Sequence, residues 1–283
     1  MRLRDLLQTR FANWPTRYRP TWNGVLNGVF PDTDVVPASL QVPSSVPLIP
    51  DPHTFPAAPA ANEFHTMRAL DRVTPSRVRA VVLGQDPYPR RRQATGRAFE
   101  QGDFVSWDGS VAYGLKHIIQ RLAQHRSGDD RYVRGDGAWD DVRADASSLQ
   151  LTSVRRLYDG WENQGVIFLN FVLTYTLPAH VFTGHARFWK PVVTAILRHL
   201  AERPSRRIVF ALWGTKCSEF FTRARILEAA QAAGTSGNCR VARFNHPSAR
   251  PQGGQRAPFL RGSNPFDVIN RQLASLGETV IDW

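Results

Sequence analysis

Residues 78–84 read VRAVVLG, an apolar and β-branched run that stops at Gly84. Runs of the same character follow at 165–171 and 207–213, with a weaker one at 239–244. Helical patterns lie between these runs, at 111–125, 185–202 and 216–233. Continuous apolar strands that alternate with helices are typical of a parallel sheet covered on both faces. The sequence therefore predicts an α/β fold built on a central parallel sheet.

The chain is strongly basic, with 36 Lys and Arg against 24 Asp and Glu and a formal net charge of +12. Such an excess favours an anionic partner, nucleic acid first, with a generically basic soluble surface as the alternative. No apolar run approaches the roughly 18 residues that span a membrane, so we expect no membrane association. The two cysteines, Cys217 and Cys239, are too few for a disulfide framework or a four-cysteine metal site. We expect both to be reduced in an intracellular protein.

Three further segments complete the predicted organisation. Residues 1–44 are expected to form a short helix and an extended stretch that pack on the main domain, residues 45–283. Residues 61–72 have the pattern of a helix with its apolar residues on one side. Residues 126–153 are polar and charged, which predicts an exposed, partly mobile insertion.

Functional residues of a parallel sheet gather beyond the carboxyl ends of its strands. The first strand is followed by GQDPY at 84–88, where the glycine permits a sharp exit and Pro87 stiffens the turn after Asp86. A carboxylate held there can orient and deprotonate a water molecule. Capping of a turn is an equal alternative on this motif alone.

Two later strand ends also carry polar side chains. Asn170 ends the second run, and its amide could read the edge of a nucleobase, although an Asx turn is the commoner role of such a residue. His246 follows the fourth run within NHPS (245–248), where a neutral histidine could stabilise a forming anion or simply be structural. Phe99 could stack on a ring or belong to the core.

Together these residues belong to an ordered set of motifs that resembles the family-1 uracil-DNA glycosylases from about residue 45 onward. The set comprises VLGQDPY (82–88), GRAF (96–99), GLKHI (114–118), the stretch 161–170, VLT (172–174), FALWG (210–214), HPS (246–248) and IDW (281–283). The resemblance implies a single α/β domain, with four parallel strands in a three-layer α/β/α arrangement. It also implies chemistry that uses neither a metal nor a cofactor.

The resemblance implies a role for each site residue. Asp86 would orient the attacking water and stabilise the cationic sugar, and His246 would donate to uracil O2 as the base leaves as an anion. Gln85 would contact uracil through its backbone, while Tyr88 would crowd C5 and so reject thymine. Phe99 would stack on the base, and Asn170 would bond O4 and N3–H. The implied DNA contacts are Pro87, Ser110, Gly214, Thr215, Ser248 and Arg250.

Several positions depart from the family pattern. Pro89 and the arginines at 90–92 replace the usual His-Gly, and these arginines either hold phosphates or form a solvated loop. Gly114 stands where the family has a serine, and Ser110 lies four residues earlier. The family's leucine wedge is replaced after His-Pro-Ser, so either Arg250 fills the gap left by a flipped base or the wedge is missing.

The implied function is hydrolysis of the N-glycosidic bond of deoxyuridine in single- and double-stranded DNA, the first step of base excision repair. The expected partner is uracil-containing DNA, and a proteinaceous inhibitor is a further candidate. We expect a monomer in the bacterial cytoplasm, with a nuclear or organellar location as the alternative. A glycosylase with shifted base preference and a catalytically idle DNA-binding protein are the competing hypotheses.

Overall fold

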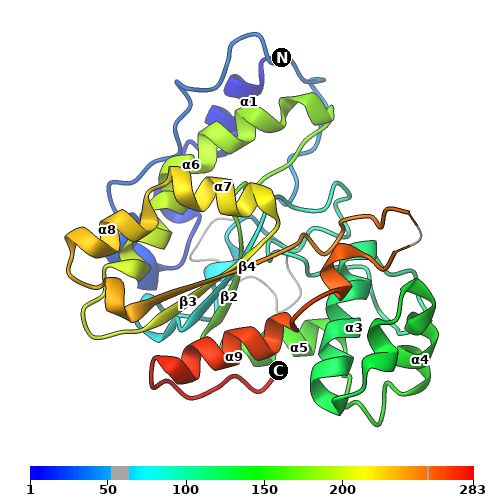
Figure 1. The fold of residues 1–283 in the computed structure, drawn as a ribbon. Coiled ribbons are helices and arrows are strands. Elements are labelled where there is room, and N and C mark those ends of the chain that lie inside the picture. The colour runs from blue at the N-terminus through cyan, green and yellow to red at the C-terminus, as the bar shows by residue number, and fades with distance from the viewer. Residues whose placement is uncertain (52–63, 254) are drawn as a thin grey trace.

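The computed structural model describes residues 1–51, 64–253 and 255–283 (Figure 1). It contains one parallel sheet in the order β2-β1-β3-β4. The strands are β1 (Ala80–Gly84), β2 (Val166–Asn170), β3 (Ile208–Trp213) and β4 (Cys239–Phe244). Each strand lies within two residues of a predicted run, and the predicted fold class is confirmed.

The helices connect and cover these strands. The α-helices are α1 (Leu3–Arg10), α2 (Asn23–Leu26), α3 (Tyr113–Ser127), α4 (Trp139–Ala144), α5 (Val154–Asn163), α6 (Phe182–Ala201), α7 (Thr215–Arg223), α8 (Ile226–Ala232) and α9 (Pro265–Ser275). Short 3₁₀ turns are η1 (Trp14–Thr16), η2 (Pro20–Trp22), η3 (Arg68–Leu70), η4 (Pro75–Arg77), η5 (Asp130–Val133), η6 (Asp136–Ala138), η7 (Ala179–Val181), η8 (Ser236–Asn238) and η9 (Pro258–Leu260).

Two hydrophobic layers cover the two faces of the sheet because successive strand residues point to opposite faces. Val81 and Leu83 pack with α1, α6, α7 and α8 on one face. Ala80 and Val82 pack with α3, α4, α5 and α9 on the other. Figure 1 shows these helix groups on either side of the strands. All residues of β1, β2 and β3 are buried, as the continuous apolar runs predict.

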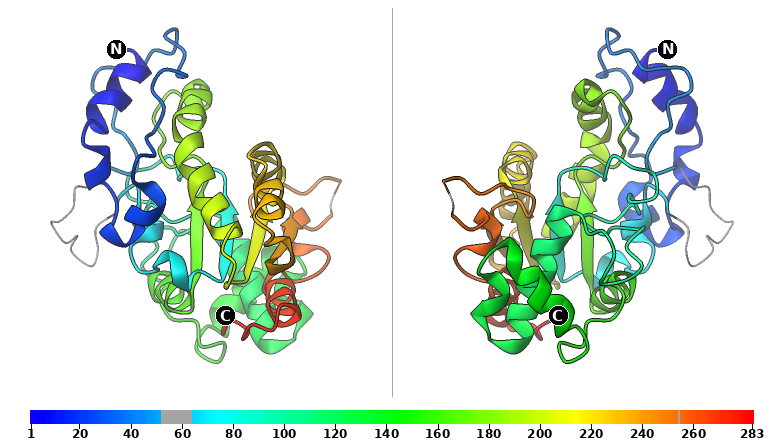
Figure 2. Two further views of the ribbon diagram at one scale, coloured as in Figure 1. Left: turned by 90° about the vertical axis from the view of Figure 1, so that its left-hand side faces the viewer. Right: turned by 90° about the vertical axis from the view of Figure 1, so that its right-hand side faces the viewer.

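The N-terminal segment packs into the first of these layers. Phe11 and Trp14 contact Trp189 of α6, with ring centroids 4.8 and 5.5 Å apart. The indole N–H of Trp22 donates to the carbonyls of Leu70 and Val73, each at 3.0 Å. Figure 2 shows the segment lying alongside α6, so these residues extend the core.

Two segments differ from the sequence prediction. Of the helix predicted at 61–72, residues 61–63 lie outside the described part, and the remainder forms turns and η3. The segment 126–153 forms η5, η6 and α4, and its aromatic residues Tyr132 and Trp139 are buried against α3. The segment 126–153 therefore packs on the domain through its aromatic residues, and it is not the wholly exposed insertion that its charge predicted.

None of the helices in the described ranges is both long and apolar enough to cross a membrane.

Trp283 closes the second hydrophobic layer. Its ring lies 4.9 Å from Phe266 and 5.6 Å from Trp161, and its indole N–H donates to the Asn270 side chain at 3.1 Å. Trp283→Ala is expected to lower the free energy of unfolding by about 3–5 kcal/mol, because it leaves a cavity where a tryptophan was buried. Denaturant unfolding followed by circular dichroism measures this loss. The control Phe30→Ala, at an exposed position, should change it by less than about 0.5 kcal/mol.

Candidate active site at the carboxyl edge of the sheet

Gly84 lies where the side chains of Asn170, Ala98 and Phe99 meet. The register of β1 and β2 places Gly84 beside Asn170. A Cβ atom at Gly84 would collide with the Asn170 amide oxygen and would lie 2.8 Å from the Ala98 Cβ and 3.1 Å from the Phe99 ring. The glycine therefore permits the Asn170 amide and the Phe99 ring to pack against the same backbone.

The chain that leaves β1 is tied to the chain that leaves β2. The Phe171 N–H donates to the Gly84 carbonyl at 3.0 Å, and the Val172 N–H donates to the Gln85 carbonyl at 2.9 Å. The Gln85 carbonyl thus accepts one hydrogen bond from the chain that leaves β2. These bonds hold the first residues of GQDPY before the turn at Pro87, which is buried.

Asp86 lies in a partly buried position close to the start of α7. Burial raises the pKa of its carboxyl group from 3.8 to about 6. Burial and the nearby Asp86 charge raise the pKa of the Cys217 thiol to about 12, so this cysteine is an inert packing residue. At neutral pH Asp86 is therefore mostly ionised, although its environment makes that charge costly.

The Tyr88 side chain contacts the backbone of Phe99. Its hydroxyl donates to the Phe99 carbonyl at 3.3 Å. Burial, with a contribution from Asp103, raises the pKa of Tyr88 well above its ordinary value, so the phenol stays neutral. Tyr88 thus lies beside the Phe99 backbone, and its expected role at uracil C5 stays a prediction.

Phe99 is packed among aromatic side chains. Its ring centroid lies 5.2 Å from that of Trp213 and 5.7 Å from that of His246. Its φ angle is +65°, a left-handed conformation that is rare for a bulky residue. The sequence analysis did not identify Trp213 as a site residue, although its place at the end of β3 was a usable signal.

The tautomer of His246 follows from its hydrogen bond. The Ser248 N–H donates to His246 Nδ1 at 3.0 Å, so a neutral ring carries its proton on Nε2. Burial lowers the pKa of His246, which favours the neutral ring. Gly214, at φ +114°, lets the ring approach the end of β3, since a Cβ there would lie 3.1 Å from two His246 atoms. His246 is therefore a neutral N–H donor.

The loop that follows His246 is held by the start of α3. His117 Nδ1 lies 2.7 Å from the Pro247 carbonyl oxygen, and its Nε2 lies 3.1 Å from Asp136 of the 126–153 segment. A Cβ at Gly114 would lie 2.6 Å from the Ser248 hydroxyl, so glycine at this position allows the loop to sit close to the helix. Sequence reasoning did not identify His117 as a support of this loop.

Arg250 stacks on an aromatic ring at the rim of this loop. Its guanidinium carbon lies 3.8 Å from the ring centroid of Tyr113, a cation–π contact. The sequence analysis left open whether Arg250 fills the place of the family's leucine. In this structure the exposed Arg250 is held over Tyr113, at the start of α3.

The other predicted DNA contacts divide into two groups. Gly214, Thr215 and Ser248 surround His246, and both Thr215 and Ser248 are exposed. Ser110 is exposed on the loop before α3, where its backbone carbonyl accepts from Gln101 at 3.1 Å. Among the described residues, no hydrogen bond or ion pair joins Ser110 to Gly214, Thr215 or Ser248. Of the arginines at 90–92, all exposed, Arg91 pairs with Asp51.

The described residues contain no group of three or more His, Cys, Asp and Glu side chains that could hold a metal ion. The arrangement instead offers a flat aromatic ring, an amide, a neutral N–H donor and a partly buried carboxylate at one sheet edge. Such a set can bind a planar heterocycle by stacking and by its polar edge, and can stabilise it as an anion.

Comparison with known proteins gives a consistent set of relatives, although no family model matches the chain. The chain is 32% identical over 232 residues to the uracil-DNA glycosylase of Bordetella avium, a match that covers 81% of this chain and 73% of the relative. Identity is 33% with the Bordetella petrii protein of that name, over the same shares. The chain is 28% identical to the uracil-DNA glycosylase of Enterococcus faecalis, over 78% of this chain and 79% of the relative.

Solved structures share the fold. The wild-type UNG from Nitratifractor salsuginis superposes with a TM-score of 0.58 at 18% identity, covering 95% of this chain and 96% of its own. A mimivirus UNG variant in complex with UGI superposes with a TM-score of 0.59 at 16% identity, covering 95% and 90%. At these identities the likeness supports the architecture alone.

Gly84→Ala tests the packing at the centre of the site. The added methyl group must displace Asn170, Ala98 or Phe99, and a shift of about 1 Å in a site residue can cost about 100-fold in rate. We expect at least that loss in kcat/KM for uracil release from an oligonucleotide, with an unchanged circular dichroism spectrum. The control Gly160→Ala lies in α5 with open space around its new Cβ, and should retain full activity. Near-normal activity of Gly84→Ala would show that this contact does not shape the site.

Proposed function

The chain belongs to the uracil-DNA glycosylase family, and we propose that it uses the site at the carboxyl edge of its sheet to excise uracil from single- and double-stranded DNA. Enzymes of this family are hydrolases that act on the N-glycosyl bond, and uracil-containing DNA is the substrate. The main support for this location of the site is that Asn170 and Phe99 pack at Gly84 and that His246 packs at Gly214. The rings of Phe99 and His246 also lie next to each other.

In this proposal the base is recognised by its face and by its polar edge. Phe99 stacks on the uracil ring, and the Asn170 amide bonds O4 and N3–H. Asn170 is almost fully buried at 3% exposure, so a base that mismatched its donor and acceptor would leave buried polar groups unpaired. Discrimination of this polar kind reaches roughly 10⁴-fold or more, which would exclude cytosine. Tyr88, whose hydroxyl donates to the Phe99 carbonyl, is proposed to exclude the thymine methyl group.

A base bound in this way has to leave the DNA stack. Asn170 is buried and Phe99 partly buried, so they could not reach the edge and face of a base inside a duplex. We therefore propose that the nucleotide is flipped into the site. The basic side chain of Arg250 and the hydroxyls of Thr215 and Ser248 would contact the surrounding phosphates.

The bond between sugar and base breaks as charge separates. The uracil leaves as an anion, and His246 donates its Nε2–H to O2, because Nδ1 already accepts from Ser248. A neutral histidine suits this role, since its donor is fixed before the charge develops. Asp86, as a carboxylate, stabilises the positive sugar and takes a proton from the water that attacks it.

The proposed chemistry requires no residue from a second copy of the chain, and we propose a monomer as the active form. A bacterial cytoplasmic location fits the bacterial relatives and the two buried, unpaired cysteines.

The excision assay tests the proposed activity and the role of Asp86. Purified protein should release uracil from a single-uracil oligonucleotide and leave an alkali-labile abasic site. Asp86→Asn should lower kcat by about 10²–10⁴-fold and leave DNA binding nearly unchanged, because the lost group acts on the water and the sugar. Asp108→Asn, at an exposed aspartate on the 101–112 loop, is the matched control and should keep full activity. DNA binding without any release of uracil by the wild type would instead indicate an idle DNA-binding protein.

The pH dependence of kcat/KM is expected to report the Asp86 carboxyl group. The active form is the carboxylate, and burial raises the pKa of this group to about 6. The rate should therefore fall about tenfold per pH unit below pH 6 and reach a plateau above it, measured on a single-stranded substrate at constant ionic strength. Binding of the same DNA to Asp86→Asn, followed by fluorescence anisotropy, is the control and should show no such step. A plateau that extends down to pH 4.5 would contradict this assignment.

A further inference from the structure

The stacking residue Phe99 holds a backbone conformation that a phenylalanine does not adopt by itself. Its φ of +65° lies in the left-handed region, which costs on the order of 1–3 kcal/mol for a bulky residue. Such a conformation persists only where the surrounding structure over-determines it. The neighbours that force it therefore control where the Phe99 ring lies.

The backbone on both sides of Phe99 is fixed by hydrogen bonds. The Ala98 N–H donates to the Phe168 carbonyl of β2 at 2.9 Å, and Tyr88 donates to the Phe99 carbonyl. Gly96, at φ +100°, crosses so close to the turn at 65–68 that a Cβ there would collide with the His65 carbonyl. These contacts fix the backbone path, but none of them joins the side chains that flank Phe99.

Those flanking side chains are charged, buried and bound to one another. Arg97 is 1% exposed, and it donates through Nε and Nη2 to the two carboxylate oxygens of Glu162 at 2.9 and 2.6 Å. Its Nη1 donates to Glu100 at 3.0 Å, and its Nη2 also donates to Asp159 at 2.6 Å. We call Arg97, Glu100, Asp159 and Glu162 the Arg97 cluster. Arg97 precedes Phe99 by two residues and Glu100 follows it directly, so the cluster holds both sides of the strained residue.

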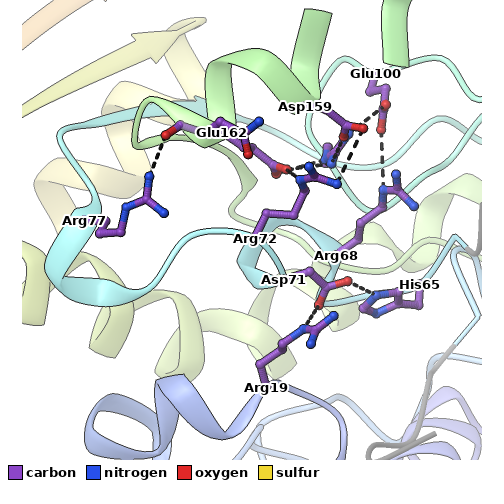
Figure 3. A network of polar contacts seen from close by, with 11 residues as sticks. Arg19, His65, Arg68, Asp71, Arg72, Arg77, Glu100, Asp159 and Glu162 are labelled. Atoms are coloured by element: carbon purple, nitrogen blue, oxygen red, sulfur yellow. Dashed lines mark hydrogen bonds and ion pairs between the residues drawn. The ribbon is translucent and has the colours of Figure 1, made fainter. Parts of the chain in front are cut away.

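Two further arginines border the Arg97 cluster (Figure 3). Arg68 lies 3.8 Å from Glu100, and Arg72 lies 3.6 Å from Asp159 and 3.9 Å from Glu162. The three arginines balance the three carboxylates in charge. Burial nevertheless raises the pKa of Glu162 above its usual range, which shows how costly this charge is in the interior.

Helix α5 connects the cluster to the base-reading amide. Glu162 and Asp159 lie in its last turns, and the chain then runs directly into β2, which ends at Asn170. The α5–β2 segment thus carries Asn170 at its end and also binds Arg97 through Glu162 and Asp159. The cluster fixes the stacking ring relative to the amide that would read the edge of the same base.

Stability alone does not account for these charges. Replacing a buried ion pair by apolar side chains of similar volume is often neutral or stabilising, because both charges are desolvated. A charge-assisted bidentate pair adds directional geometry, which an apolar contact lacks. We propose that Arg97 and Glu162 are positioning residues that set the Phe99 stacking surface against Asn170. This inference rests on the proposed function of that site.

The variant Arg97→Met/Glu162→Met separates positioning from stability. It removes one charge of each sign and leaves the Arg68–Glu100 and Arg72–Asp159 pairs in place. We expect a melting temperature within a few degrees of the wild type, a 10- to 100-fold loss in kcat/KM for uracil release, and a comparable weakening of inhibition by free uracil. A folded variant with wild-type kcat/KM and wild-type uracil inhibition would overturn the proposal.

A double-mutant cycle with Phe99→Ala shows whether the loss acts through the ring. If the cluster positions Phe99, adding Arg97→Met/Glu162→Met to Phe99→Ala should change kcat/KM by less than about twofold. Equal losses in both backgrounds would mean that the cluster acts elsewhere. Full activity of Phe99→Ala would overturn the proposed stacking role, and inactivity of the wild type would overturn the proposed function itself. The three failures are therefore distinguishable.

A second buried arginine, Arg203, provides a control for loss of stability. Arg203→Met removes another buried arginine, which donates to the Val78 carbonyl at 2.9 Å, beside the start of β1 and away from the site. Arg203→Met should lower the melting temperature without changing kcat/KM at temperatures below the unfolding transition.

If the Arg97→Met/Glu162→Met variant fails to fold, Glu162→Gln is the alternative, because it keeps the side-chain volume and one hydrogen bond. It should then show a several-fold loss of kcat/KM that disappears in the Phe99→Ala background, and an unchanged kcat/KM would overturn the proposal.

Discussion

The parallel pairing of β1 with β2 sets Gly84 beside Asn170, and the arrangement of the site depends on this register. The missing side chain at Gly84 leaves room for the Asn170 amide and the Phe99 ring to contact the same stretch of backbone. Beyond the strands, hydrogen bonds to the Gly84 and Gln85 carbonyls keep the two chains together, so Asp86 leaves the sheet from a fixed point. A slip of one strand by one residue would turn all of its side chains to the opposite face and separate these groups.

Burial then places the two proposed catalytic groups, Asp86 and His246, in different charge states. It raises the pKa of Asp86 to about 6 and lowers that of His246, so near neutrality the first is an anion and the second an uncharged donor. A protonated His246 ring would carry a positive charge before the base begins to leave. A neutral His246, with its tautomer set by Ser248, instead keeps its N–H available for the charge that forms as the bond breaks.

The strands were predictable because each is a continuous apolar run in a doubly covered sheet, and the strand-end residues followed from that geometry. Taken singly, Asp86, Asn170 and His246 allowed structural explanations; the ordered motifs and the relatives' names favour the functional ones. The Arg97–Glu162 pair was not predictable, because partners 65 residues apart look like two solvated charges in the sequence. Over the described residues 64–72, the expected helix is replaced by turns and η3, because tertiary contacts overrode a local pattern. In 126–153, abundant charges concealed the aromatic residues that anchor the segment.

The contact of His117 with both Pro247 and Asp136 joins the 126–153 segment to the loop that carries His246. Through His117, near the start of α3, two stretches that are separate in the sequence are thus linked to each other. In a chimera between glycosylases, exchanging either stretch alone would pair a loop with a support shaped for another protein. The two stretches are better treated as a single exchangeable module, together with the first turns of α3 between them.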